Sequence, residues 1–175
     1  CGTAESRART PRERTPGMKG DKDSYYLTFD EIPQSVKDAM VVTEDRDFYK
    51  HEGVNFLSTA KAAVMLVESK LRHQDISRGG STITQQLAKN VFLSNERSYE
   101  RKVREIFIAL DLEKKYTKDQ ILEFYINNIY FANGYYGIEA ASKGYFNKSA
   151  KDLDLAEAAF LCSIPNRPSL YNPLE

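Results

Sequence analysis

The chain has 175 residues, of which 41% are hydrophobic, and this is enough apolar content for one compact domain. Its 25 basic and 25 acidic residues cancel to a formal net charge of zero, which excludes the global positive field of a general nucleic-acid-binding protein. Two cysteines are too few for a disulfide scaffold, and no apolar run approaches the roughly 20 residues that a transmembrane helix needs.

The segment 1–23 is predicted to be a disordered linker or tag. It contains almost no large apolar side chain, several arginines, and Pro11 and Pro16. Such a segment cannot bury enough surface to offset the entropy of ordering. The folded domain is therefore expected to occupy residues 24–175.

A helical pattern begins at Asp30, which is a suitable N-cap. Val36, Ala39 and Met40 have the spacing of one buried face. Glu44 then lies at the C-terminal end of this helix, so the sequence places a carboxylate where the helix stops.

A second helix is predicted after Asn55, which would be its N-cap. Apolar residues recur there at helical spacing and form an amphipathic stripe of Phe56, Ala60, Ala63, Val64, Val67 and Leu71. Gly79 and Gly80 interrupt the pattern, and a further helix is expected from about Ser81.

The longest predicted helix runs from Ser98 to Tyr116. The side chains expected to be buried are Tyr99, Val103, Ile106, Phe107 and Leu110. The opposite side carries Arg97, Arg101, Arg104 and Glu105. A charged stripe of this kind is usually a solvated helix face.

Two further helices begin with capping-box patterns, Thr117 with Gln120 and Asp154 with Glu157. Pro165 is expected to end the last helix. Strand character is limited to residues 25–29 and to the aromatic-rich turn 129–136. The predicted fold class is therefore mainly α.

Glu44 and Asp45 are adjacent carboxylates at a predicted helix end. Joining two sugars requires a base for the acceptor hydroxyl and a group that stabilises the charge of the leaving group. In a partly shielded cleft, two neighbouring carboxylates raise the pKa of one of them, which suits a base near neutral pH. An isolated Glu-Asp pair is more often solvated surface. Nearby, His51 is expected to hydrogen-bond into its turn, and Gly53 to adopt a backbone conformation that other residues resist.

Two stretches carry most of the functional information. Residues 44–53 read Glu-Asp-Arg-Asp-Phe-Tyr-Lys-His-Glu-Gly, and residues 79–90 read Gly-Gly-Ser-Thr-Ile-Thr-Gln-Gln-Leu-Ala-Lys-Asn. Arg-Lys-Val-Arg-Glu follows at 101–105, and the later segments 123–127 and 158–169 fit the same pattern. In this order they resemble the peptidoglycan glycosyltransferase domain, glycosyltransferase family 51, of class A penicillin-binding proteins and monofunctional relatives. The resemblance runs from about Tyr25 to the last residue.

The resemblance implies a role for each matching residue. Glu44 would be the catalytic base, and the donor's pyrophosphate would be held by Lys89, Arg97 and Arg104. Glu105 would be the second catalytic acidic residue, placed to hold Mg²⁺ or Mn²⁺. The other substrate-binding positions would be Asp45, Lys61, Ser81, Gln85 and Gln86. Lys61 stands where many relatives carry arginine, which keeps the charge but not a bidentate grip on phosphate.

The implied fold is a lysozyme-like, mainly α glycosyltransferase that polymerises lipid II. Glu44 would deprotonate the acceptor hydroxyl, which attacks with inversion to form a β-1,4 link and releases undecaprenyl pyrophosphate. The implied partners are lipid II, the growing glycan strand and the outer leaflet of the membrane, and moenomycin would bind as a mimic of the growing chain. The expected location is the extracytoplasmic face of the cell membrane, and no nucleic-acid partner is expected. Relatives continue with further helices, which implies a domain that is incomplete at its C-terminus, and a transpeptidase domain can follow in the full-length chain.

Two other interpretations remain open at this point. A lytic transglycosylase or lysozyme would share the fold type and a lone catalytic glutamate but would cleave glycan, and it would not need the charged stripe. A non-enzymatic helical module could use that stripe to bind phosphate or nucleic acid. That interpretation leaves Glu44, Asp45 and the segment 79–86 without a purpose, and zero net charge argues against it.

Overall fold

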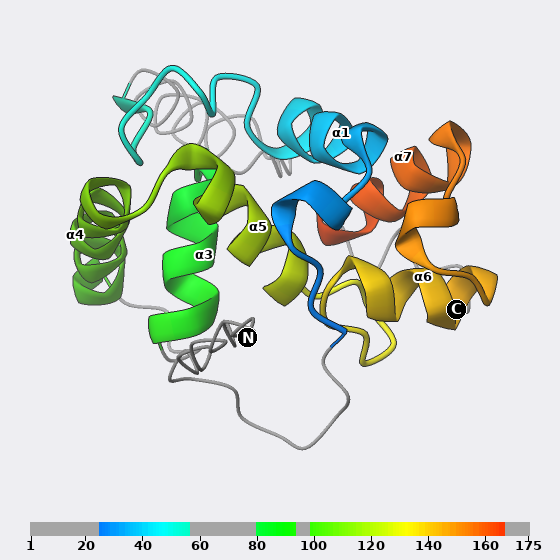
Figure 1. Ribbon diagram of the computed structural model, residues 1–175. Helices are drawn as coiled ribbons and strands as arrows, with labels where there is room; N and C mark the ends of the chain where they lie inside the picture. The colour runs from blue at the N-terminus through cyan, green and yellow to red at the C-terminus, as the bar shows by residue number, and fades with distance from the viewer. Residues whose placement is uncertain (1–24, 57–79, 94–98, 167–175) are drawn as a thin grey trace, which may run out of the picture.

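The computed structural model describes residues 25–56, 80–93 and 99–166, which form a mainly helical domain (Figure 1). The α-helices are α1 (Gln34–Glu44), α3 (Ile83–Phe92), α4 (Tyr99–Lys115), α5 (Lys118–Asn128), α6 (Ile138–Phe146) and α7 (Leu155–Ser163). Short 3-10 helices occupy Phe29–Glu31, Ala150–Asp152 and Ile164–Asn166. The helix predicted after Asn55 lies outside the described residues from 57 on. Among the helices of the described part, none combines the length and the apolarity needed to cross a bilayer.

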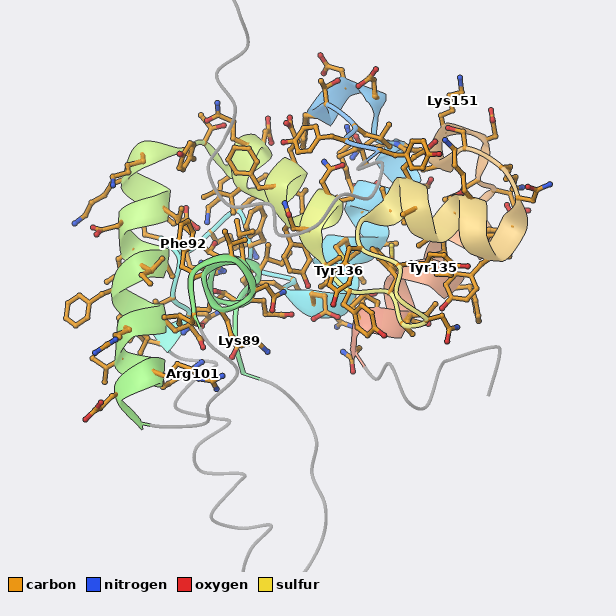
Figure 2. All side chains as sticks on the ribbon, turned by 90° about the horizontal axis from the view of Figure 1, so that it is seen from below. Lys89, Phe92, Arg101, Tyr135, Tyr136 and Lys151 are labelled. Carbon is orange, nitrogen blue, oxygen red and sulfur yellow. The ribbon has the colours of Figure 1, made fainter. Side chains whose placement is uncertain are left out.

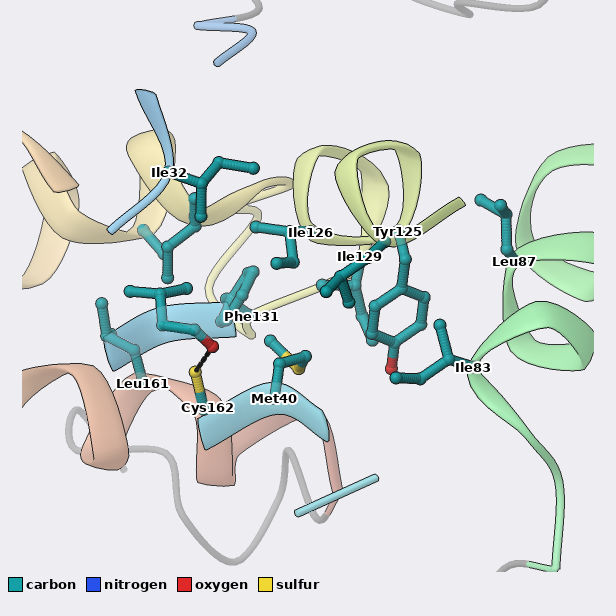
Figure 3. Close-up of a cluster of buried hydrophobic side chains, with 14 of the residues drawn as sticks. Ile32, Met40, Ile83, Leu87, Tyr125, Ile126, Ile129, Phe131, Leu161 and Cys162 are labelled. Carbon is teal, nitrogen blue, oxygen red and sulfur yellow. Dashed lines mark hydrogen bonds between the residues drawn. The ribbon is translucent and has the colours of Figure 1, made fainter. Parts of the chain in front are cut away.

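The hydrophobic core is built around α5, which contacts α3, α4 and α6. α3 packs between α4 and α5, while α1 packs against α7 (Figure 1). Figure 3 shows the buried side chains of these helices meeting, among them Met40, Ile83, Leu87, Tyr125, Leu161 and Cys162. The core therefore joins the C-terminal part of α1 to the start of α3, and this junction positions the site described below.

The capping boxes at Thr117 with Gln120 and at Asp154 with Glu157 are both present, as the sequence predicts. A further box at Thr82 and Gln85 begins α3. The predicted cap at Asp30 is wrong, because Thr28 and Glu31 form a capping box around a 3-10 turn and α1 begins only at Gln34. The intervening Ile32 precedes a proline and is extended, with φ −76° and ψ 125°, so one helix cannot run through this point.

The two predicted strands do not form within the described residues, where strand pairing is limited to an isolated bridge between Tyr130 and Tyr136. The extended segment 25–28 pairs instead with side chains of α5. Asn127 accepts a hydrogen bond from the Leu27 amide at 2.9 Å and donates to the Leu27 carbonyl at 2.8 Å. Glu123 accepts from the Phe29 amide at 2.8 Å. Side-chain partners thus satisfy backbone groups that a neighbouring strand would otherwise pair.

The predicted buried face of α4 is also wrong. Val103 and Phe107 are 52% and 65% exposed, whereas Glu105, Ala109 and Leu112 are buried. The helix turns this less apolar side toward α3, where Glu113 accepts a hydrogen bond from Thr84, and toward the loop that ends at Gly53. A Cβ placed on Gly53 would lie 2.9 Å from the Ala109 carbonyl oxygen. Close approach selects the small side chain of Ala109, so packing overrides the larger apolar stripe.

Candidate active site

Glu44 is the last residue of α1, whose buried Val36 and Met40 anchor the helix in the core. Gln86 of α3 donates a hydrogen bond from Nε2 to Glu44 Oε2 at 2.9 Å. The other carboxylate oxygen, Oε1, is buried and accepts no hydrogen bond of standard geometry. The carboxylate is therefore fixed at one oxygen, and its other oxygen has hydrogen-bonding capacity left.

The environment of Glu44 raises its pKa above the usual value. Burial is the largest cause, and the nearby negative charge of Asp45 adds a smaller increase. Hydrogen bonding by Gln86 and by the neighbouring side chain of Asn166 acts in the opposite direction. The sequence argument predicts a raised pKa, but burial rather than the adjacent carboxylate is the main cause.

Asp45 has a different environment from its neighbour. Its Oδ2 accepts hydrogen bonds from His51 Nε2 at 2.8 Å and from the Ile83 amide at 3.1 Å. The second bond places the carboxylate at the N-terminus of α3, where negative charge is favourable. Asp45 thus joins the end of α1 to the beginning of α3.

The imidazole of His51 is hydrogen-bonded at both nitrogens, which confirms its predicted place in the turn. The Gly53 amide donates to His51 Nδ1 at 3.2 Å. Because a backbone amide can only donate, Nδ1 must accept, and Nε2 carries the proton that it donates to Asp45. Gly53 has φ +84°, the left-handed conformation expected of it.

A second cluster lies on α4 and on the segment before α3. Lys102 Nζ donates to Ser81 Oγ at 3.0 Å and forms an ion pair with Glu105 Oε1. Glu105 is only 3% exposed, so Lys102 neutralises a buried charge. The family motifs assign roles to the neighbouring Arg97 and Arg104 and none to Lys102, so the sequence did not predict this contact. The spacing of three between Lys102 and Glu105, which is typical of helical ion pairs, was the signal that could have found it.

The described residues do not fit a protein-built metal centre at Glu105. They contain no cluster of three or more His, Cys, Asp or Glu side chains placed to hold an ion. Glu105 already pairs with the Lys102 ammonium, and a cation would have to displace that group. We therefore derive no chemical step through a metal ion.

The remaining predicted site residues differ in burial, and two of them lie outside the described residues. Gln85 is fully buried, its Oε1 accepts from the Thr82 amide at 3.0 Å, and its buried Nε2 has no hydrogen-bond partner. Lys89 and Arg104 are exposed. Figure 2 shows Lys89 and the neighbouring cation Arg101 at the same end of the α3–α4 pair. Lys61 and Arg97 lie outside the described residues.

The Glu44 cluster and the Lys102 cluster meet on one short segment, 81–86. Ser81 belongs to the Lys102 cluster, Gln86 holds Glu44, and the Ile83 amide between them binds Asp45. The segment thus connects a buried carboxylate of raised pKa with the Lys102 ammonium. Chemically, this arrangement can accept a proton at one point and stabilise developing negative charge at another.

Comparisons with known proteins identify the family to which the chain belongs. The model of the transglycosylase family matches residues 13–175. The chain is 48% identical over 154 residues to penicillin-binding protein 4 of Bacillus subtilis, which covers 88% of this chain and 24% of that protein. It is 49% identical over 155 residues to penicillin-binding protein 1A of Pseudomonas aeruginosa, covering 89% of the chain and 18% of that protein. Penicillin-binding protein 1A of Aquifex aeolicus is 44% identical over 160 residues, covering 91% and 22%.

The chain therefore spans no more than about a quarter of the length of these relatives. The helical architecture and the family match together confirm the predicted mainly α, lysozyme-like fold class.

Proposed function

Because the chain belongs to the transglycosylase family, we propose that it performs glycosyl transfer in peptidoglycan synthesis with Glu44 as the general base. The observation that carries this proposal is the Glu44 carboxylate itself. Its Oε2 is fixed by Gln86, and its buried Oε1 has no hydrogen-bond partner of standard geometry. A raised pKa increases its affinity for a proton, as a general base near neutral pH requires.

The proposed substrates are lipid II and the growing glycan strand. Glu44 takes the proton from the 4-hydroxyl of the acceptor's N-acetylglucosamine, and this oxygen attacks the anomeric carbon of the donor's N-acetylmuramic acid. The bond to the pyrophosphate breaks from the opposite face, so an α-linked donor gives a β-1,4 product and undecaprenyl pyrophosphate. Since both substrates are anchored in lipid, the proposed place of action is the outer leaflet of the cell membrane.

The departing pyrophosphate needs cations that receive its charge. We assign this role to Lys89, Arg97 and Arg104, as the family motifs imply. Lys102 supports the same side of the site, because it holds Ser81 and neutralises Glu105. A buried, unpaired Glu105 carboxylate would repel a pyrophosphate.

A glycan-cleaving enzyme is the second candidate, because a glutamate with a raised pKa can also act as a general acid. A retaining hydrolase needs a second carboxylate as nucleophile. The nearest one in sequence, Asp45, is buried and already bonded to His51 and to the Ile83 amide. This disfavours a retaining hydrolase, and a glycan-cleaving enzyme that works with a lone glutamate would not need the exposed cations Lys89 and Arg104.

The test is incubation of the chain with labelled lipid II, followed by separation of polymer from monomer, and a parallel incubation with purified peptidoglycan. We expect polymer from lipid II and no soluble fragments from peptidoglycan. Glu44→Gln should lower the polymerisation rate by about a hundredfold to ten-thousandfold, because the amide cannot accept the proton. Glu52→Gln, an exposed carboxylate in the same loop, is the matched control and should retain the rate. A Glu44→Gln variant with more than about a tenth of the wild-type rate contradicts the assignment.

A further inference from the structure

We propose that Tyr125 is a positioning residue for Glu44, acting through Gln86 by fixing which end of the Gln86 amide faces the carboxylate. This inference rests on the proposed function, in which Glu44 is the base. Tyr125 belongs to α5, Gln86 to α3 and Glu44 to α1, so the three side chains connect three separate helices.

The geometry gives the chain of hydrogen bonds a direction. Tyr125 Oη donates to Gln86 Oε1 at 3.1 Å, and Gln86 Nε2 donates to Glu44 Oε2 at 2.9 Å. An amide side chain can present either its oxygen or its nitrogen to a neighbour, and its partners decide which. While the phenol donates to the amide oxygen, the NH₂ group faces Glu44.

The phenol is a permanent donor. Tyr125 is 1% exposed, and its ring lies in the core beside Ile83 (Figure 3). Burial raises the pKa of Tyr125 well above its usual value, and the nearby carboxylates of Glu44 and Asp45 act in the same direction. Tyr125 therefore keeps its proton near neutral pH and can donate to Gln86.

This orientation matters because the amide NH₂ group stabilises the charged form of Glu44, whereas the amide oxygen would stabilise the protonated form. The NH₂ group opposes the effect of burial and keeps the base available. Asp45 and Cys162 cannot replace it. Asp45 raises the pKa of Glu44, and Cys162 of α7, whose own pKa is raised to about 12, stays a neutral thiol. Asn166 is the only other side chain that lowers the pKa of Glu44 among the described residues.

Removing the phenol hydroxyl should free the Gln86 amide to turn over when Glu44 is protonated. In Tyr125→Phe we expect the pKa of Glu44 to rise by about one unit, which corresponds to an approximately tenfold lower rate on the acid side of the pH profile. At high pH, where Glu44 is ionised in both proteins, kcat should return to near the wild-type value. KM for lipid II should change little, because Tyr125→Phe leaves Gln86 in place and the pyrophosphate is assigned to Lys89, Arg97 and Arg104.

The experiment measures the titration of Glu44 directly, by infrared difference spectra of the carboxyl group across pH with Glu44→Gln as the reference, alongside the pH–rate profile. Tyr145→Phe is the matched control, since it also removes a phenol hydroxyl, one that donates to the Phe131 carbonyl at 2.8 Å. In Tyr145→Phe, the pKa of Glu44 measured in this way should equal that of wild type. In a Gln86→Leu background, Tyr125→Phe should produce no additional shift, because its effect requires the amide.

An unchanged Glu44 titration in folded Tyr125→Phe overturns the inference, and so does a full additional shift in the Gln86→Leu background. Failure of the proposed function looks different. In that case Glu44→Gln stays active, while the infrared titration of Glu44 still responds to Tyr125→Phe.

Discussion

Two adjacent carboxylates in this chain have opposite roles because they meet different partners. Asp45 has both a histidine and a helix-terminal amide on one oxygen, and Glu44 has one oxygen without a partner of standard geometry. A carboxylate oxygen that accepts two hydrogen bonds is fixed in place, and one with acceptor capacity left can take part in proton transfer. The contacts, rather than the residue type, thus make Glu44 the proposed base and Asp45 a structural residue.

Lys102 offers a test at the level of a single residue. Lys102→Met removes the partner of the buried Glu105 carboxylate, and an uncompensated buried charge should lower the free energy of unfolding by about 1–3 kcal/mol. Glu105→Gln in the same chain should restore most of the loss, because the amide is neutral. Urea unfolding of the two single variants and the double variant measures the coupling. Lys114→Met is the control, since Lys114 forms only an exposed ion pair with Asp111. Additive effects would show that the Lys102–Glu105 pair contributes nothing.

At the level of elements, the loop 45–53 is held against α4 by a close backbone approach. Gly53→Ala should destabilise the fold for two reasons, the cost of φ +84° for a side chain and the contact with the Ala109 carbonyl at 2.9 Å. Gly134→Ala separates the two causes, because Gly134 has φ +82° and no atom within 4 Å of the added Cβ. We expect about 1 kcal/mol for Gly134→Ala and a larger loss for Gly53→Ala, measured by chemical denaturation. Equal losses would mean that the loop moves away from α4 without cost.

Helix termini could be predicted from the sequence, while the orientation of the helices could not. The capping boxes at Thr117 and Asp154 depend on residues three positions apart, so local sequence contains all the information. The buried face of α4 packs against α3 and against a glycine that lies far earlier in the chain, and the local sequence of α4 does not contain these contacts.

The same limit applies to the candidate site. Its motifs identify Glu44, Ser81 and Gln86, but the hydrogen bonds from Tyr125 and Lys102 require knowledge of which helices are neighbours. Asp30 shows a limit of a different kind. An acidic residue before a helical pattern is a weak signal when a proline stands between them.

For the molecule as a whole, the burial of Glu44 should appear in the pH dependence of stability. The unfolded carboxyl has a pKa near 4.5, and the folded one has a higher pKa, so the folded state binds more protons between these values. By linkage, the contribution of Glu44 to stability is fully present below pH 4.5 and is lost as pH rises through the folded pKa. Glu44→Gln has no such loss and should be more stable than wild type at neutral pH.

Thermal unfolding of wild type and Glu44→Gln between acid and neutral pH measures this difference. The gap should widen with rising pH and then become constant. Glu52→Gln should follow the wild-type curve, because its carboxylate is exposed. A gap that does not depend on pH would mean that Glu44 titrates with its unfolded pKa.

The pairing of the extended segment 25–29 with α5 has a consequence for amide hydrogen exchange. The Leu27 and Phe29 amides donate to side chains of Asn127 and Glu123, about a hundred residues away, whereas the Thr28 amide between them donates to the local and exposed Glu31. Leu27 and Phe29 should therefore exchange slowly, at a rate set by the separation of this segment from α5, and Thr28 should exchange through local fraying. The amides of Leu27 and Phe29 are thus protected from exchange as in a β-strand, although the segment forms no strand. Their exchange rates measure how firmly this segment is attached to α5.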